Sequence, residues 1–170
     1  MRRLLVSMGL TDVAGITGRV VRRILPMLGE IQVDVVLGGR APSLPVLQAL
    51  AASDGRMTLH IDTGQMAPLT LDADAAIGGG GSTTWERCVL GLPALQVTLA
   101  DNQREAAAAV AAAGAALVAD GLDPAFDYAA GRLLGDQALR SSLSRAAARL
   151  CDGQGTRRVA DAVLALMGVV

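Results

Sequence analysis

Short apolar runs alternate with segments of helical spacing along most of the chain, which is the pattern of an α/β protein. Val33 to Leu37 is almost continuous Val and Leu, as expected for a strand buried on both faces of a parallel sheet. Between Ala14 and Leu28, apolar residues recur every three or four positions, which predicts an amphipathic helix. The same criteria predict strands at 4–8, 33–37, 57–61, 75–77, 94–99 and 115–118, and helices at 14–28, 44–50, 66–71, 85–90, 100–113, 126–134, 139–150 and 159–170.

This alternation predicts a single domain over residues 1–170, with a three-layer α/β/α, Rossmann-like fold and a mostly parallel sheet. The last three helices are expected to pack on the sheet. In such folds, ligands bind outside the carboxyl ends of the strands, where the strand order reverses. Glycines and polar residues follow three predicted strands, at 9–12, 78–86 and 101–103. We therefore expect these three turns to share one crevice.

The segment from Gly78 to Pro93 has the sequence GGGGSTTWERCVLGLP. Four consecutive glycines carry a large backbone entropy cost, so they predict a loop. Ser82, Thr83 and Thr84 favour the start of a helix, where free N–H groups suit an anion such as a phosphate. The structural alternative is a capping box, in which the side chains of Thr83 and Glu86 each serve the other's backbone N–H. The segment matches neither G-x-G-x-x-G nor a P-loop, and the chain contains no lysine.

Two other turns and one strand carry further candidate residues. Asp12 either caps the first helix or belongs, with Gly9, to a second loop that faces a ligand. Asn102 and Gln103 begin a helix, where they are either an N-cap and a solvated residue or a pair of ligand contacts. His60 is the single histidine, and the sequence offers it no obvious nucleophile or orienting partner. We therefore predict a structural or rim position for His60.

Composition narrows the classes of function. A net charge of -1, a pI of about 5.7 and only three aromatic residues argue against nucleic-acid binding. Two distant cysteines and one histidine argue against a metal site or a disulfide framework. No segment approaches the roughly 20 apolar residues of a membrane span, and Gly9 and Asp12 interrupt the apolar start too early for a signal peptide. We expect a cytoplasmic protein without a metal or cofactor.

The string IGGGGSTTWERCVLGLP, followed by LADNQ at Leu99 to Gln103, resembles the C-terminal half of a family of nucleotide-sugar hydrolases. These enzymes act in the pseudaminic-acid pathway and release UDP from UDP-2,4-diacetamido-2,4,6-trideoxy-β-L-altropyranose. The resemblance covers nearly the whole chain and departs at Leu10, where the family usually has a second glycine. The parent enzyme is similar to two-domain glycosyltransferases of the GT-B type, whose C-terminal domain holds the nucleotide of the sugar donor.

The resemblance implies UDP or a UDP-sugar as the ligand, in pseudaminic-acid or surface-polysaccharide biosynthesis. The uracil base would lie near residues 63–66. The family's water-activating histidine belongs to the N-terminal half, and His60 does not match it. We therefore expect no catalytic residue on this chain and an N-terminal domain that acts in cis or in trans. The implied contacts are Gly80, Gly81, Ser82 and Thr83 to the diphosphate, Glu86 to the ribose, and Asn102 and Gln103 to the sugar or its phosphate, with Gly9 on the facing loop.

Two other functions are compatible with the same loops. One is the donor-binding subunit of a split GT-B glycosyltransferase. The other is a non-catalytic module that binds a nucleotide.

Overall fold

The computed structural model describes residues 1–168 and has one parallel sheet with helices on both sides. The predicted three-layer α/β/α fold is confirmed. The strands are β1 (Arg3–Ser7), β2 (Gln32–Leu37), β3 (Met57–Ile61), β4 (Ala75–Gly79), β5 (Ala94–Thr98) and β6 (Leu117–Asp120). The α-helices are α1 (Ile16–Ile24), α2 (Leu44–Ser53), α3 (Met66–Asp72), α4 (Thr83–Val89), α5 (Arg104–Ala112), α6 (Pro124–Gly135), α7 (Gln137–Leu150) and α8 (Gly155–Leu166), with 3-10 turns at Val13–Gly15, Leu25–Met27 and Asp101–Gln103.

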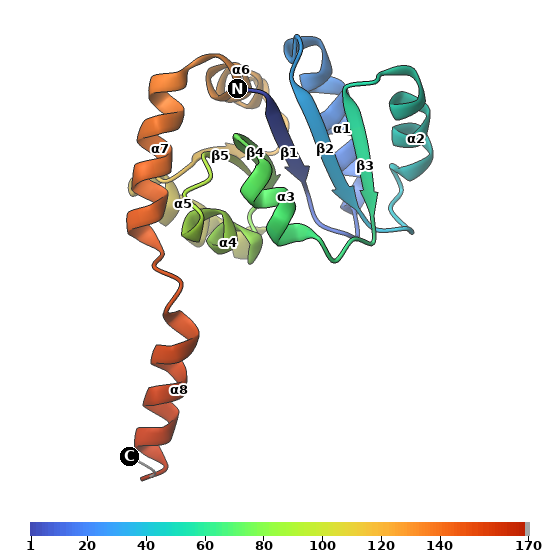
Figure 1. Ribbon diagram of the computed structural model, residues 1–170. Helices are drawn as coiled ribbons and strands as arrows, with labels where there is room; N and C mark the ends of the chain where they lie inside the picture. Colours follow the sequence, from blue (N-terminus) through green and yellow to red (C-terminus); the bar gives the residue numbers. More distant parts are fainter. Residues whose placement is uncertain (169–170) are drawn as a thin grey trace.

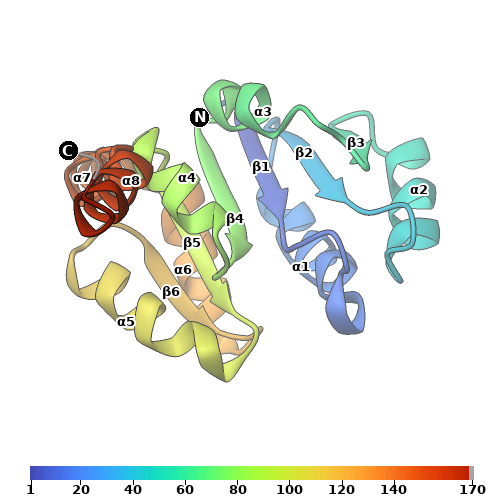
Figure 2. The ribbon, with the colours of Figure 1, turned by 90° about the horizontal axis from the view of Figure 1, so that it is seen from below.

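Two apolar cores hold the layers together, one on each face of the sheet. Successive strand residues point to opposite faces, so Leu4 and Val6 of β1 enter the core beneath α1, α2 and α6, while Leu5 enters the core beneath α3, α4 and α5. Figures 1 and 2 show these helices on either side of the twisted sheet. Helix α7 contributes to both cores, since Leu143 joins the first core and Ala146 and Ala147 join the second.

The strand order is β3-β2-β1-β4-β5-β6, so the order reverses between β1 and β4. Ser7 at the end of β1 lies in register with Gly78 of β4, and Gly79 lies in register with Val97 of β5. The turns after β1, β4 and β5 therefore leave the sheet side by side. This arrangement places the three candidate turns at the topological switch point.

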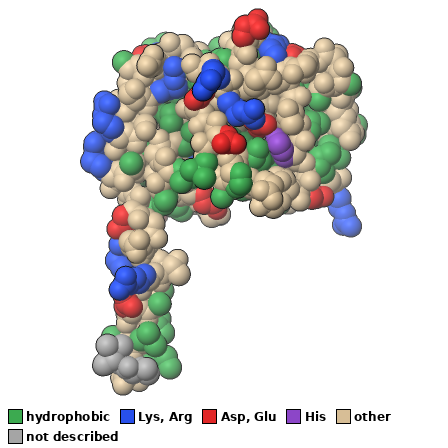
Figure 3. All heavy atoms as spheres, in the orientation of Figure 1, with side chains coloured by type: hydrophobic (Ala, Val, Ile, Leu, Met, Phe, Trp, Pro, Cys, Tyr) green, Lys and Arg blue, Asp and Glu red, His purple; other side chains and the backbone are tan. Residues whose placement is uncertain are grey.

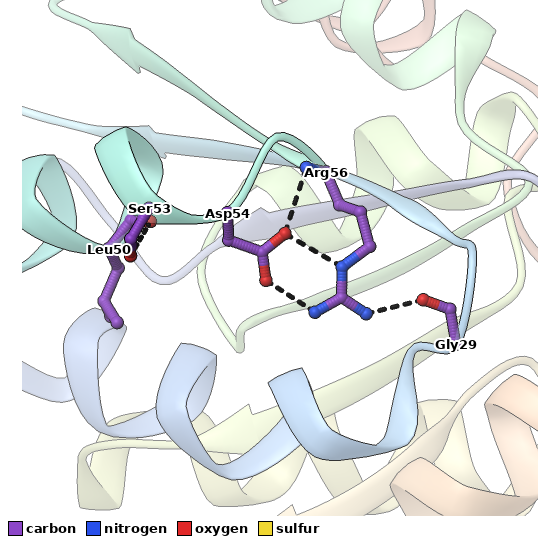
Figure 4. A network of polar contacts seen from close by, with 5 residues as sticks. All are labelled: Gly29, Leu50, Ser53, Asp54 and Arg56. Carbon is purple, nitrogen blue, oxygen red and sulfur yellow. Dashed lines mark hydrogen bonds and ion pairs between the residues drawn. The ribbon is translucent and has the colours of Figure 1, made fainter.

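At the amino end of the sheet, opposite to the candidate turns, an ion pair holds the turn before β3. Between α2 and β3, the guanidinium of Arg56 pairs with Asp54 through two nitrogens and donates to the carbonyl of Gly29 (Figure 4). The hydrogen bond from Arg56 lowers the pKa of Asp54 to about 2. These residues fix a turn at the amino end of β3, away from the candidate turns.

Helix α8 contradicts the expectation that the last helix packs on the sheet. It projects from the body of the protein (Figure 1), and none of its residues is buried. The apolar stripe that predicted packing is present, and Val159, Val163 and Met167 on it are exposed. The nearby face of the sheet is already covered by α4 and α7, so the sheet itself offers α8 no free surface there. Val170, which the prediction included, lies outside the described residues.

No helix among residues 1–168 is long and apolar enough to cross a membrane.

Candidate functional site

A cavity of about 380 Å³ lies at the carboxyl end of the sheet, where the turns after β1, β4 and β5 meet. This volume falls within the range of roughly 300–1,000 Å³ that is usual for small-ligand sites. The expectation of one shared crevice agrees with this geometry. The cavity is lined by Ser7, Met8, Gly9, Thr11, Val13, Gly79, Gly81, Ser82, Thr83, Leu99, Ala100 and Gln103.

Five of the predicted contact residues are brought together on this cavity, and three are not. Gly80 lies behind its wall, where an added Cβ would stand 2.8 Å from Nε2 of Gln96 and 3.1 Å from Oε1 of Gln103. Glu86 and Asn102 are exposed and do not line the cavity. Their roles at the ribose and the sugar stay predictions.

The glycine run is only partly a loop, which corrects the prediction for its first half. Gly78 and Gly79 belong to β4 and are buried. A Cβ on Gly78 would overlap Nη1 of Arg87 and lie 2.9 Å from the backbone oxygen of Ser7. The first glycines are therefore needed because a large side chain and a neighbouring strand press on β4. Gly81 differs, since a Cβ there would meet nothing within 4 Å.

The capping box predicted as the alternative is not formed. The hydroxyl of Thr83 accepts a hydrogen bond from Nη1 of Arg87 at 3.2 Å, and Glu86 makes no side-chain hydrogen bond with any described residue. Ser82 precedes α4 but does not cap it with its side chain. Within residues 1–168, no acceptor is found for the backbone N–H groups of Gly81, Ser82 and Thr83. These donors therefore stay open at the rim of the cavity.

Helix α4 has only seven residues, so its dipole contributes little. The donor character of the site comes from the loop and from side chains. Oε1 of Gln103 accepts from the backbone N–H of Leu99 at 2.9 Å, which leaves the amide NH₂ of Gln103 available as a donor. Gln103 is therefore not the freely solvated residue of the structural alternative. Asn102 is not an N-cap either, because Ala100 holds that position.

The turn after β1 is held in place by Asp12, which is fully buried. Its carboxylate accepts from the backbone N–H of Thr17 at 2.7 Å and from that of Ser43 at 2.8 Å. Burial raises the pKa of Asp12, but hydrogen bonding by the side chains and backbone N–H groups of Ser43 and Thr17 outweighs burial and leaves the pKa below its usual value. Asp12 thus ties the turn to α1 and α2, while Gly9 and Thr11 line the cavity.

Leu10 lies on the same turn, where the resembling family usually has a glycine. Its carbonyl accepts from the backbone N–H of Gly38 at 3.1 Å, while its side chain is exposed. Leu10 does not line the cavity; it lines a neighbouring hollow that Thr11 and Gly38 share.

His60 has a partner that the sequence analysis missed. Nε2 of His60 lies 2.7 Å from Oδ1 of Asp34, and Oδ2 of Asp34 accepts from Arg3 at 2.7 Å. This group lies on the face of β2 and β3, away from the cavity, and Figure 3 shows the single histidine on that surface. The signal was an aspartate within the apolar strand at 32–37, since a buried carboxylate needs a partner. The geometry agrees with a structural position for His60.

Arg87 and Gln96 are two further buried polar residues beside the cavity that the sequence analysis did not single out. Both are at least 96 % buried, and both contact the hydroxyl of Thr84. The spacing of Arg87 four residues after Thr83 was the available signal, because such residues meet on one face of a helix.

Solved structures with a similar fold include complexes with nucleotides. Among solved structures, the chain is similar to the S. aureus MnaA-UDP co-structure, with a TM-score of 0.77 at 17% identity over 99% of this chain and 46% of that chain. A UDP-N-acetylglucosamine 2-epimerase gives a TM-score of 0.70 at 18% identity, over 99% and 44% of the two chains. The Streptomyces sp. SF2575 glycosyltransferase SsfS6 with thymidine diphosphate gives 0.61 at 22% identity, over 86% and 36%. The fold is similar to that of GT-B glycosyltransferase domains.

The chain is also similar in sequence to a curated protein. The chain is 28% identical over 165 residues to the spore coat polysaccharide biosynthesis protein SpsG of Bacillus subtilis (strain 168). The match covers 93% of this chain and 48% of SpsG, so the chain spans about half the length of that relative. No protein-family model matches the sequence.

Proposed function

We propose that this chain is the nucleotide-sugar-binding domain of a UDP-sugar hydrolase that acts in the cytoplasm, in pseudaminic-acid or surface-polysaccharide biosynthesis. The observation that carries the proposal is the cavity at the switch point, where open backbone N–H groups of Gly81, Ser82 and Thr83 meet the amide of Gln103. Backbone and amide N–H donors suit the oxygens of a diphosphate. Similarity to SpsG supports the polysaccharide setting.

In this reaction, water attacks the anomeric carbon while the bond from that carbon to the diphosphate oxygen breaks. The electrons of the broken bond leave with UDP, and a proton of the water passes to a base on the partner domain. The donors around the cavity would stabilise the negative charge that grows on the departing diphosphate. On this proposal Glu86 binds the ribose hydroxyls, and Asn102 and Gln103 bind the sugar or its phosphate.

The base would come from an N-terminal domain, in cis or in trans. The chain spans about half of SpsG and less than half of the solved structures compared above. In Figure 1, α8 extends on the side of the molecule toward which β1, β2 and β3 point, which is also the side of the cavity. A domain that faces the cavity would therefore have the exposed apolar stripe of α8 within reach.

Titration of the chain with UDP tests the binding proposal. We expect saturable binding by calorimetry, with weaker binding when Gly81→Ala places a methyl group on the cavity wall. Absence of UDP binding by the folded chain would refute the proposal. A UDP-release assay with a UDP-sugar tests the missing base, since we expect turnover only when the partner domain is added.

A donor-binding subunit of a split glycosyltransferase is the second candidate, and the similarity in fold to SsfS6 favours it. This candidate predicts UDP release that depends on a sugar acceptor, whereas the hydrolase releases UDP with water alone. Binding without turnover, even with the partner domain and an acceptor present, would instead indicate a non-catalytic module.

A further inference from the structure

Arg87 on α4 is a buried cation without an acidic partner. Its side chain is 4% exposed, and no carboxylate of residues 1–168 lies within 4.0 Å of its guanidinium. Burial lowers its pKa to about 10, so Arg87 still carries its charge at neutral pH. Burying an unpaired charge is costly. The structure thus holds a positive charge that no carboxylate of residues 1–168 contacts, and Glu86 acts on it only from beyond 4.0 Å.

The guanidinium is directed at the wall of the cavity. Nη2 donates to the carbonyl of Gly79 at 3.0 Å, and Nη1 donates to the hydroxyl of Thr83 at 3.2 Å. Gly79 and Thr83 both line the cavity. Arg87 therefore donates a hydrogen bond to a carbonyl oxygen that would otherwise repel an anion. It also turns the hydroxyl of Thr83 into a donor, because an oxygen that accepts from Arg87 has its own proton left to give.

Gln96 on β5 gives an independent sign of an incomplete polar site. It is 1% exposed, and its Nε2 has no partner among the described residues. The hydroxyl of Thr84 accepts from Arg87, so its single proton goes to Oε1 of Gln96 at 3.1 Å. This bond orients the amide and directs Nε2 toward Gly80, at the turn that forms the cavity rim. Both buried groups beneath this turn are donors.

We propose that Arg87 is a positioning residue that makes the cavity selective for a diphosphate. This inference rests on the proposed nucleotide site and names the group that gives it affinity for the anion. The ligand's diphosphate supplies the counter-charge that no described carboxylate supplies by contact, across a wall that leaves Arg87 only 4% exposed. In such a low-dielectric setting, the attraction between opposite charges is much stronger than in water. Arg87 acts through Thr83 and the held carbonyl of Gly79, and it does not touch the ligand.

The test compares ligands with and without the diphosphate on folded variants. UDP, inorganic pyrophosphate and uridine are titrated against the wild type, Arg87→Met and Arg87→Lys. We expect Arg87→Met to weaken UDP and pyrophosphate at least tenfold and to change uridine affinity less than twofold. Arg87→Lys, which keeps the charge, should restore part of the preference for UDP over uridine. The matched control is Arg140→Met. Arg140 also donates to backbone carbonyls, those of Leu133 and Leu134, but it lies near the amino ends of the strands, away from the cavity.

The outcomes separate this inference from the proposed function. A wild type that binds neither UDP nor pyrophosphate refutes both. A wild type that binds UDP, together with an Arg87→Met variant that binds UDP equally well or loses UDP and uridine by the same factor, refutes only the role of Arg87. If Arg87→Met does not fold, a double-mutant cycle of Arg87→Lys with Thr83→Val replaces it. Coupling between the two changes in UDP affinity supports the inference, and additive losses overturn it.

Discussion

Alanine substitutions at Gly78 and Gly81 separate two roles of the glycine run, because Gly78 is packed in the sheet and Gly81 lines the cavity. An alanine at Gly78 would place its methyl group against Nη1 of Arg87 and 2.9 Å from the oxygen of Ser7. Ser7 is in register with Gly78 on the neighbouring strand, so the sheet itself would have to shift. An alanine at Gly81 would meet nothing within 4 Å, and Gly81 has no positive φ.

The expected loss at Gly78 follows from two opposing effects. Forcing an extra carbon into a packed core costs about 1–3 kcal/mol, and the backbone contact with Ser7 places Gly78→Ala at the upper end. Replacing glycine also reduces the entropy of the unfolded chain, which offsets about 0.4–1 kcal/mol. The net change in the free energy of unfolding is therefore a loss of about 2 kcal/mol, or about 4–8 °C in Tm for a chain of this size.

Urea unfolding, followed by circular dichroism, measures both variants under the same conditions. We expect Gly78→Ala to lower the midpoint, and Gly81→Ala to leave it unchanged or slightly raised. UDP titration should show the reverse order, because only the Gly81 methyl group stands on the cavity wall. Equal stability of the two variants would refute the account of Gly78 as a packing position, whatever the result with UDP.

Four other perturbations test Glu86, Asp12, His60 and helix α8 separately. Glu86→Ala should weaken UDP binding by about 1–3 kcal/mol in calorimetry if a hydrogen bond to the charged group is lost. The control, Glu30→Ala at the amino end of β2, should leave UDP affinity unchanged. Unchanged affinity in Glu86→Ala would remove Glu86 from the site. Asp12→Asn should lower the free energy of unfolding at pH 7. The folded pKa of Asp12 is depressed, so the contribution of its carboxylate to stability is complete above the unfolded pKa of about 3.8 and is lost as pH falls through the lower folded pKa. The urea midpoints of wild type and variant should therefore converge in acid, and a difference that does not depend on pH would contradict this. His60→Ala should lower the Tm and leave UDP affinity unaltered, and a loss of affinity would tie His60 to the site. Deletion of residues 155–170 should leave the urea midpoint of the remaining chain unchanged, because α8 buries nothing, and should reduce binding of an apolar dye; a large fall in the midpoint would show that α8 packs on the body.

The order of strands and helices was predictable because apolar spacing reports directly on which faces of a segment are buried. The β1 and β2 runs and the α1 stripe were found in this way, within a few residues of their observed ends. The convergence of three turns was also predictable, since the carboxyl ends of parallel strands share one edge. Prediction failed where a distant neighbour set the outcome. Gly78 and Gly79 are strand residues because they pair with β1 and β5, and Arg87, on another element, fills the space beside Gly78.

The sequence alone determined the α/β class, the parallel sheet and the place of the crevice, since these depend on periodicity and on the rules that govern crossover connections. Only the tertiary structure decided which polar groups are buried and with whom they pair. His60 meets Asp34 across two strands, and Arg87 meets Thr83 and Gly79 without a carboxylate. Only the tertiary structure decided the position of α8 as well. An apolar stripe indicates that a helix can pack on another surface, but it does not indicate which surface. Burial, and a pair such as His60 with Asp34, depend on residues far apart in the chain, and local sequence carries no record of those distances.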